Sequence, residues 1–238
     1  MNKRGNVLAI VIAIILVILL AFGIGIYIIY KSATDLSQAD KLNTTESTTI
    51  YEPLVKSIIL GEEQTITDND VNGIIAKLLN EYTAKLTETD TKNSLVVKRV
   101  AVYMQNNSTA KLYADLHYNQ FRFIFTADAN ITLDNDNKLI SIDVSNTKIG
   151  TLSIPTDFIM SNVSDSLKQI SPDIQVSNNT IIVPSEYTFE FMKKEITLYI
   201  SKLTLSEGLA TVQTNSAMDV IGQFIDEFIS SLITPGAV

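Results

Sequence analysis

The sequence predicts an α+β fold in which a curved antiparallel sheet of about seven or eight strands packs on two or three amphipathic helices. Residues 121–133 place an apolar side chain at every second position, and Ile124 is the one apolar residue between them, which is the period of a long strand with one buried face. Similar segments follow one another across short turns and outnumber the helical stripes. This order favours an antiparallel sheet over a parallel sheet built from βαβ units.

The chain begins with a short basic stretch, residues 1–6, and an apolar run, residues 7–30. As a helix the run would span roughly 36 Å, enough to cross the roughly 30 Å core of a bilayer. It is longer than the apolar region of a cleaved signal peptide, about 7 to 15 residues, so an uncleaved anchor is favoured over cleavage. Lys3 and Arg4 precede it. The positive-inside rule therefore favours a single-pass cell-membrane protein with a cytoplasmic N-terminus, and the opposite orientation is the alternative.

Polar residues 31–49 indicate a flexible linker, and residues 50–238 an extracytoplasmic domain. Beyond residue 31 the chain carries 15 basic and 26 acidic side chains, a formal charge of −11. A nucleic-acid partner is not expected, because phosphate contacts need clustered Lys and Arg. The chain has no cysteine, so disulfides and thiolate sites are excluded and the domain needs a hydrophobic core.

The first amphipathic helix is expected over residues 68–86. Thr67 is the predicted N-cap, and Asp70 stands three residues further on, as in a capping box. Gly73 lowers helix propensity and would permit close packing. The apolar stripe at helical spacing consists of Val71, Ile74, Ile75, Leu78, Leu79, Tyr82 and Leu86.

Four strands are expected next, at residues 95–105, 110–118, 121–133 and 139–145. Residues 134–137, Asp-Asn-Asp-Asn, are typical of a hairpin turn, and they lack the full pattern of a calcium loop. Residues 149–155 close this meander at Pro155, since proline cannot continue strand pairing.

The C-terminal part is expected to begin with a helix over residues 156–170, with Phe158, Ile159, Val163, Leu167 and Ile170 on its apolar side. A short hairpin is expected over residues 174–183, and residues 186–194 are ambiguous. Another hairpin is expected to pair residues 196–205 with 209–214, and a strongly apolar helix is expected over 216–233.

Enzyme activity is not expected, and no cofactor or metal is implied. The one histidine, His117, shares a strand face with Lys111, Tyr113 and Asp115, but no nucleophile motif accompanies it. A His–Asp pair alone does not supply the geometric roles that catalysis needs, so a solvated strand histidine is the favoured interpretation.

The apolar face of residues 121–133 is the candidate ligand site, because two small residues interrupt its large side chains. That face carries Phe121, Phe123, Phe125, Ala127, Ala129, Ile131 and Leu133. A hydrophobic ligand would fill the space above the alanines, and closure into an ordinary core is the alternative. Two helix stripes would complete the groove, formed by Ile74, Leu78 and Tyr82 and by Ile159, Val163 and Leu167.

The motif Gly150-x-Leu152-x-Ile154-Pro155, between a strand meander and a helix, resembles that of the YpmS-like family of membrane-anchored envelope proteins of Gram-positive bacteria. The resemblance covers roughly residues 64–214. Members of this family share an N-terminal anchor, a helix that opens with Thr and an acidic residue, and a strand meander before the motif. It implies an envelope protein without an established activity. More distantly, the plan is similar to tubular lipid-binding domains, in which a long sheet wraps a helix around a lipid groove.

Two functions are compatible with these features. The first is a non-enzymatic membrane-anchored protein whose external domain binds a lipid or another hydrophobic ligand. The second is a scaffold or accessory subunit of an envelope complex for secretion, division or sporulation, which binds a protein partner through its apolar terminal helix or a strand edge.

Overall fold

The computed structural model describes residues 33–84, 95–161, 164, 171–191, 194–218 and 222. The predicted anchor at 7–30 lies outside these residues, as do residues 165–170 and most of the predicted terminal helix. Within the described part of the chain, no helix combines the length and the hydropathy that a membrane crossing requires.

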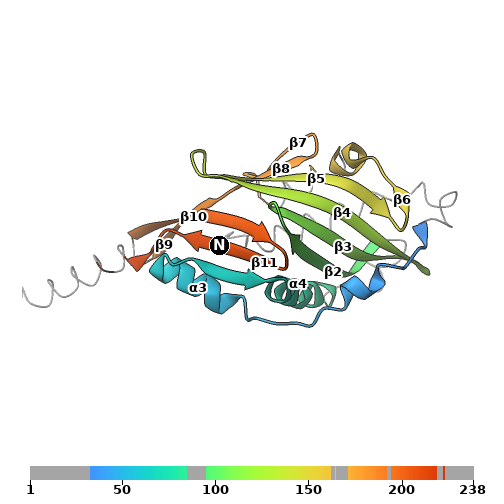
Figure 1. The fold of residues 1–238 in the computed structure, drawn as a ribbon, viewed down its shortest axis with the longest axis horizontal. Helices are drawn as coiled ribbons and strands as arrows, with labels where there is room; N and C mark the ends of the chain where they lie inside the picture. Colours follow the sequence, from blue (N-terminus) through green and yellow to red (C-terminus); the bar gives the residue numbers. More distant parts are fainter. Residues whose placement is uncertain are drawn as a thin grey trace, which may run out of the picture.

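Seven strands form the larger antiparallel sheet, in the order β2-β3-β4-β5-β8-β7 with β6 paired to β5 (Figure 1). The predicted meander is confirmed, and β4 covers the whole of the alternating segment. The bounds are β2 (Leu95–Gln105), β3 (Thr109–Tyr118), β4 (Phe121–Asp134), β5 (Leu139–Ile149), β6 (Leu152–Ser153), β7 (Gln175–Ser177) and β8 (Thr180–Pro184).

A second antiparallel sheet of four strands has the order β1-β11-β10-β9. Its bounds are β1 (Gln64–Thr67), β9 (Glu186–Phe191), β10 (Lys194–Ser206) and β11 (Leu209–Thr214). The prediction of one curved sheet was therefore wrong. Strand β10 pairs with β9 and β11, and β11 also pairs with β1. Strand β8 pairs with the edge of β5 in the larger sheet. Ser185 joins the two sheets, since its amide donates to the Lys138 carbonyl and its carbonyl accepts from the Ile200 amide.

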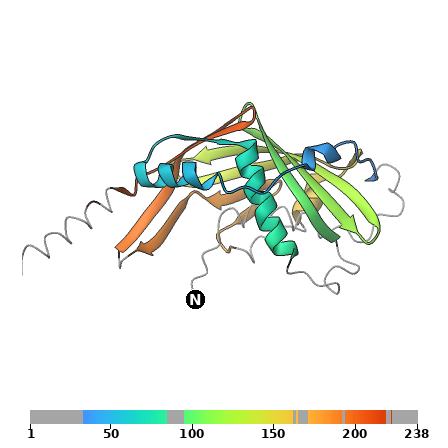
Figure 2. The ribbon, with the colours of Figure 1, turned by 90° about the horizontal axis from the view of Figure 1, so that it is seen from below.

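Three helices are described in full, and two of them lie along the lower side of the sheets in Figure 1. Helix α4 (Asp68–Thr83) begins with the predicted capping box between Thr67 and Asp70, and in Figure 2 it runs across the larger sheet. Helix α3 (Tyr51–Leu60) was not predicted. It has no side-chain N-cap, and it ends at Gly61, whose φ of 69° suits glycine. The third is a short 3-10 helix, η2 (Ala39–Leu42).

Residues 33–49 differ from the flexible linker that their composition predicts, because they are packed on the domain. Leu42 is fully buried in a small cluster with Ala101, Tyr113 and Ile124. The Tyr103 hydroxyl donates to the Lys41 carbonyl at 2.7 Å. Burial of Leu42 and hydrogen bonds to the domain together hold this otherwise polar segment in place.

The segment around Ser47 lies directly on helix α4 at Gly73. The Ser47 amide donates to the Gly73 carbonyl at 3.1 Å, and a Cβ added at Gly73 would lie 2.5 Å from the Ser47 Cβ. The glycine therefore permits the close packing that the sequence suggests, and its cost in helix propensity is offset by this contact.

Gly73→Ala is expected to destabilise the protein by about 1–3 kcal/mol, because the new methyl group meets Ser47 backbone atoms that cannot rotate away. Thermal unfolding followed by circular dichroism measures the effect. Gly222→Ala is the control, since a Cβ there meets nothing within 4 Å. Helix propensity alone would stabilise both variants by up to about 1 kcal/mol, so an equal gain in both would contradict the packing argument.

Candidate functional site

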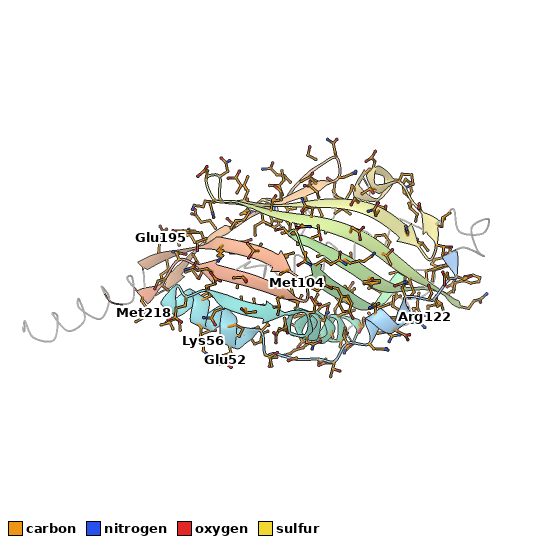
Figure 3. The ribbon with its side chains drawn as sticks, in the orientation of Figure 1. Glu52, Lys56, Met104, Arg122, Glu195 and Met218 are labelled. Carbon is orange, nitrogen blue, oxygen red and sulfur yellow. The ribbon has the colours of Figure 1, made fainter. Side chains whose placement is uncertain are left out.

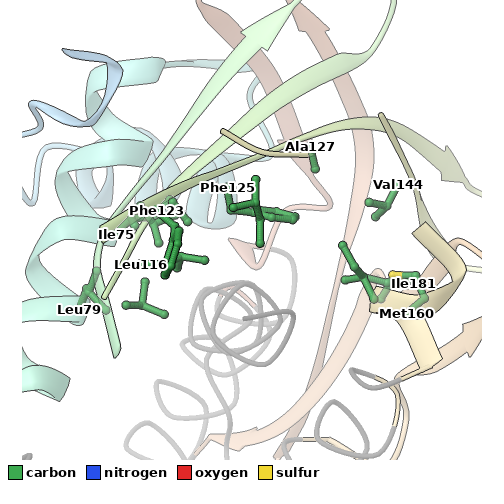
Figure 4. Close-up of a cluster of buried hydrophobic side chains, with 14 of the residues drawn as sticks. Ile75, Leu79, Leu116, Phe123, Phe125, Ala127, Val144, Met160 and Ile181 are labelled. Carbon is green, nitrogen blue, oxygen red and sulfur yellow. The ribbon is translucent and has the colours of Figure 1, made fainter. Parts of the chain in front are cut away.

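The first half of the apolar face of β4 is at the centre of the main hydrophobic cluster (Figure 4). Phe123, Phe125 and Ala127 are buried there, and Phe125 has no exposed surface. Phe121, one step nearer the β3–β4 turn, is partly buried against the same cluster. The inward-facing side chains of Phe123, Phe125 and Ala127 are therefore part of a closed hydrophobic core.

The second half of the same face is more open. Ala129, Ile131 and Leu133 are half-buried, although the last two still pack against the main cluster. The strand register places Ala129 between Ala110 of β3 and Val144 of β5. At this point three neighbouring strands thus present small or branched side chains, and they form an apolar surface without large side chains.

Helix α4 approaches β4 with a different edge of its stripe from the one expected. Ile75 and Leu79 are the helix residues buried in the main cluster with Phe123. Ile74 is also fully buried, but in a second cluster that contains Met104 and the smaller sheet. Leu78 is partly buried against both clusters.

Tyr82 keeps 48% of its surface exposed and belongs to neither of the two buried clusters that α4 contacts. Its place in a groove with Ile74 and Leu78 stays a prediction. The helix stripe is wide, and its spacing alone does not show which edge faces which sheet. Tyr82 lies seven residues, or about two turns, beyond Ile75 on the same side of the helix, and it is exposed next to the end of α4 at Thr83.

The second predicted helix is described over residues 156–161, and Ile159 is fully buried in the main cluster as expected. Met160 is buried beside it, which the sequence analysis missed. The other two residues of this stripe, Val163 and Leu167, lie outside the described residues.

The motif that precedes this helix forms a tight turn between β5 and β6. Gly150 has a φ of 57°, and its amide donates to the Ile124 carbonyl of β4 at 2.7 Å. The buried Thr147 hydroxyl donates to the Ile154 carbonyl at 2.6 Å. Backbone geometry thus accounts for glycine at the first position of the motif.

The opposite face of the larger sheet contains a cluster of charged residues around Asp115, which we call the Asp115 cluster: Arg99, Asp115, His117 and Arg122. The Asp115 side chain is only 1% exposed. Arg99 donates to its Oδ2 through Nε at 3.1 Å and Nη2 at 2.9 Å. Arg122 donates to Oδ1 through Nε at 2.8 Å and to Oδ2 through Nη2 at 3.0 Å.

His117 completes this cluster, with its Nε2 3.1 Å from Asp115 Oδ1. The strand register explains the convergence, because Arg99 is opposite Asp115 and His117 is opposite Arg122. The simple picture of a solvated histidine was therefore incomplete. The sequence analysis considered the His–Asp pair but missed both arginines, which come from two other strands.

Burial raises the pKa of Asp115, but hydrogen bonds from Arg122 and Arg99 lower it by more, so the carboxyl titrates below its ordinary range. A carboxyl whose pKa is lower in the folded state stabilises the fold above its unfolded pKa of about 3.9. That contribution is lost as the pH falls through the folded-state pKa.

We expect the free energy of unfolding to fall between about pH 5 and pH 2, and part of this slope to come from Asp115. Urea unfolding at a series of pH values measures the slope. Asp115→Asn is expected to be less stable at neutral pH and to lose less stability on acidification. Parallel pH profiles for the two proteins would show that the Asp115 cluster does not contribute to acid sensitivity.

Among the residues that the structure describes, no three His, Asp or Glu side chains gather in an arrangement that could hold a metal ion. The Asp134–Asn137 segment forms the predicted turn, in which Asp134 Oδ1 accepts hydrogen bonds from the amides of Asp136 and Asn137. The chemically distinctive features of the described chain are therefore an apolar face and a cluster of cationic side chains.

Comparisons with protein-family models, curated proteins and solved structures find no match to this chain. The resemblance to the YpmS-like family therefore stays a prediction from its short motif.

Proposed function

We propose that this protein is a non-enzymatic, membrane-anchored envelope protein whose extracytoplasmic body binds a lipid or another hydrophobic ligand along β4. One observation carries the proposal. The apolar face of β4 is closed at Phe123, Phe125 and Ala127, then half-open at Ala129, Ile131 and Leu133. An apolar surface that is continuous with the core and still accessible is a typical feature of hydrophobic ligand sites.

One acyl chain would cover part of this face. The seven inward positions extend over roughly 40 Å at about 3.3 Å per residue, and the half-open positions Ala129, Ile131 and Leu133 extend over roughly 13 Å of that length. Each methylene group that leaves water contributes about 0.8 kcal/mol, so even a short buried segment yields useful affinity. The acidic body argues against recruitment by anionic lipid headgroups, and so the acyl chain would dominate recognition.

The proposed location follows from the apolar run at 7–30, with the N-terminus in the cytoplasm and residues 50–238 outside. A single anchor would keep the body close to the bilayer, where apolar ligands are concentrated. Membership of the YpmS-like family is proposed on Gly150, Leu152, Ile154 and Pro155.

Ala129→Leu is expected to abolish lipid binding without lowering the melting temperature, because the added side chain occupies the half-open surface rather than a filled core. The full-length protein in detergent would be analysed by native mass spectrometry and by titration with a fluorescent fatty acid. Thr132→Leu is the matched control, since it adds bulk to an exposed position of the same strand.

The opposite result is equally clear. If wild-type protein carries no co-purified lipid and binds no fluorescent fatty acid, the proposal fails. If Ala129→Leu lowers stability by about 1–3 kcal/mol, the face is a closed core.

A scaffold or accessory role in an envelope complex is the second candidate, favoured by the outer surface of α3. Tyr51, Val55 and Ile59 lie at spacings of four residues and are all exposed. Exposed apolar stripes of this kind often bind other proteins. A Val55→Glu, Ile59→Glu double variant that keeps lipid binding but loses a co-purifying envelope protein would favour this role.

A further inference from the structure

Two of the three arginines of the chain and its histidine are concentrated at one point of the larger sheet. The sequence contains three arginines and one histidine. Two of these arginines, Arg99 and Arg122, and the histidine, His117, converge on the carboxylate of Asp115. Lysine is much the commoner basic residue in this chain, and yet both strand residues that donate to Asp115 from β2 and β4 are arginines with planar side chains.

One carboxylate does not balance this group of cations. Two guanidinium groups and one carboxylate leave a local charge of +1 when His117 is neutral, and +2 when it is protonated. Asp115 is 1% exposed, whereas Arg99, Arg122 and His117 keep 42%, 31% and 36% of their side-chain surface open. The negative charge is therefore buried beneath the positive charge, and water meets the cationic groups.

Hydrogen-bonding capacity also remains on the solvent side. Two guanidinium groups carry about ten N–H donors. Within the described part of the chain, Asp115 and Asn43 accept five hydrogen bonds from them, the longest of which is from Arg99 Nη1 to Asn43 Oδ1 at 3.4 Å. Asp115 thus orients the two forks, and the outward donors are held in place.

We propose that Arg99, Arg122 and His117 bind an oxyanion, a phosphate or a carboxylate group, on the outer face of β2–β4. Figure 3 shows Arg122 at the end of the larger sheet that carries η2. Planar guanidinium groups match the oxygen geometry of such anions and can bind them through paired hydrogen bonds. The site is on the face opposite to Phe123 and Phe125, so it is independent of the proposed hydrophobic site.

The single histidine provides a direct probe of this site. The Hε1–Cε1 signal of His117 is the only histidine signal of the full-length protein, and NMR in a non-ionic detergent follows it during titration with sodium phosphate at constant ionic strength. We expect a saturable shift of the signal with phosphate concentration, because a bound anion changes the surroundings of the imidazole ring.

Arg122→Gln is expected to weaken phosphate binding about tenfold or more, which corresponds to about 1.4 kcal/mol. Lys111→Gln is the matched control, since Lys111 is on the same face of β3 but pairs with Asp128 at 3.7 Å. Retention of the circular-dichroism spectrum and melting temperature in Arg122→Gln would show that loss of binding is not loss of fold.

Parallel titrations with dihexanoyl phosphatidic acid and with acetate distinguish the sources of the anion. Tighter binding of the phospholipid than of phosphate would assign the site to a lipid headgroup, and equal binding would assign it to a free anion. A His117 signal that shifts linearly with every salt, or equally in Arg122→Gln and wild type, would overturn the proposal and leave a structural ion-pair network.

Discussion

Phe125→Ala is expected to lower the free energy of unfolding by about 3–5 kcal/mol, the largest effect of any substitution considered for this chain. The side chain is fully buried at the centre of the main cluster, between β3 and β5, where truncation removes apolar contacts and leaves a cavity. Urea unfolding monitored by circular dichroism measures the change.

Phe158→Ala provides the control for this prediction, because half of the Phe158 surface is exposed. We expect its effect to stay below about 1.5 kcal/mol, since less apolar surface returns to water. Equal losses for the two variants would mean that the apolar face of β4 is not the centre of the core.

Asn72→Ala is expected to destabilise the protein by about 2–4 kcal/mol, because it leaves two backbone groups of an edge strand without partners. The buried Asn72 amide group accepts from the Val102 amide at 2.7 Å and donates to the Val102 carbonyl at 2.9 Å. In this way a side chain of α4 takes the place of a neighbouring strand at the free edge of β2.

Asn80→Ala is the matched control on the same helix, since the Asn80 amide bonds only the exposed Glu46 carboxylate in the described residues. Its effect should stay within about 0.5 kcal/mol. Asn72→Ala should also increase aggregation in light scattering after mild heating, because an unprotected strand edge pairs with other chains. Unchanged stability and solubility would show that water satisfies Val102 as well as Asn72 does.

Asp68 protects the same edge of β2 two residues beyond Val102, since its Oδ1 accepts from the Met104 amide at 2.8 Å. Neither residue is singled out by the sequence pattern. Their role depends on where the helix crosses β2, which composition and period do not encode.

The local sequence pattern predicted an element correctly where the geometry of that element depends on its own residues. The alternation of residues 121–133 predicted β4 because a strand exposes its side chains to two environments in turn. Thr67 and Asp70 predicted the start of α4 because their side chains bond nearby backbone amides. Helix α3 was missed because it has neither a capping side chain nor a buried apolar stripe.

The apolar side of several elements was predicted for the same reason. Phe123, Phe125, Ala127 and Ile159 are buried in the main cluster, and their assignment to a ligand site stays a prediction. Ile75 and Leu79 were predicted in the apolar stripe of α4 but not assigned to the site, because the side of α4 that faces β4 depends on the elements that the helix meets. The wide apolar stripe of α4 serves two clusters at once.

The Asp115 cluster shows most clearly where sequence information ends. Alternation within β3 puts Asp115 and His117 on one face, and that much is a local property. Arg99 and Arg122 reach the same carboxylate only through the registers of β2–β3 and β3–β4. The amino-acid sequence determines the strands of the meander, the turns between them, the helix cap and the negative charge, since these depend on composition and on neighbours in the chain. Division into two sheets, protection of the β2 edge and assembly of the cationic group required the tertiary structure, because they depend on pairings between distant segments.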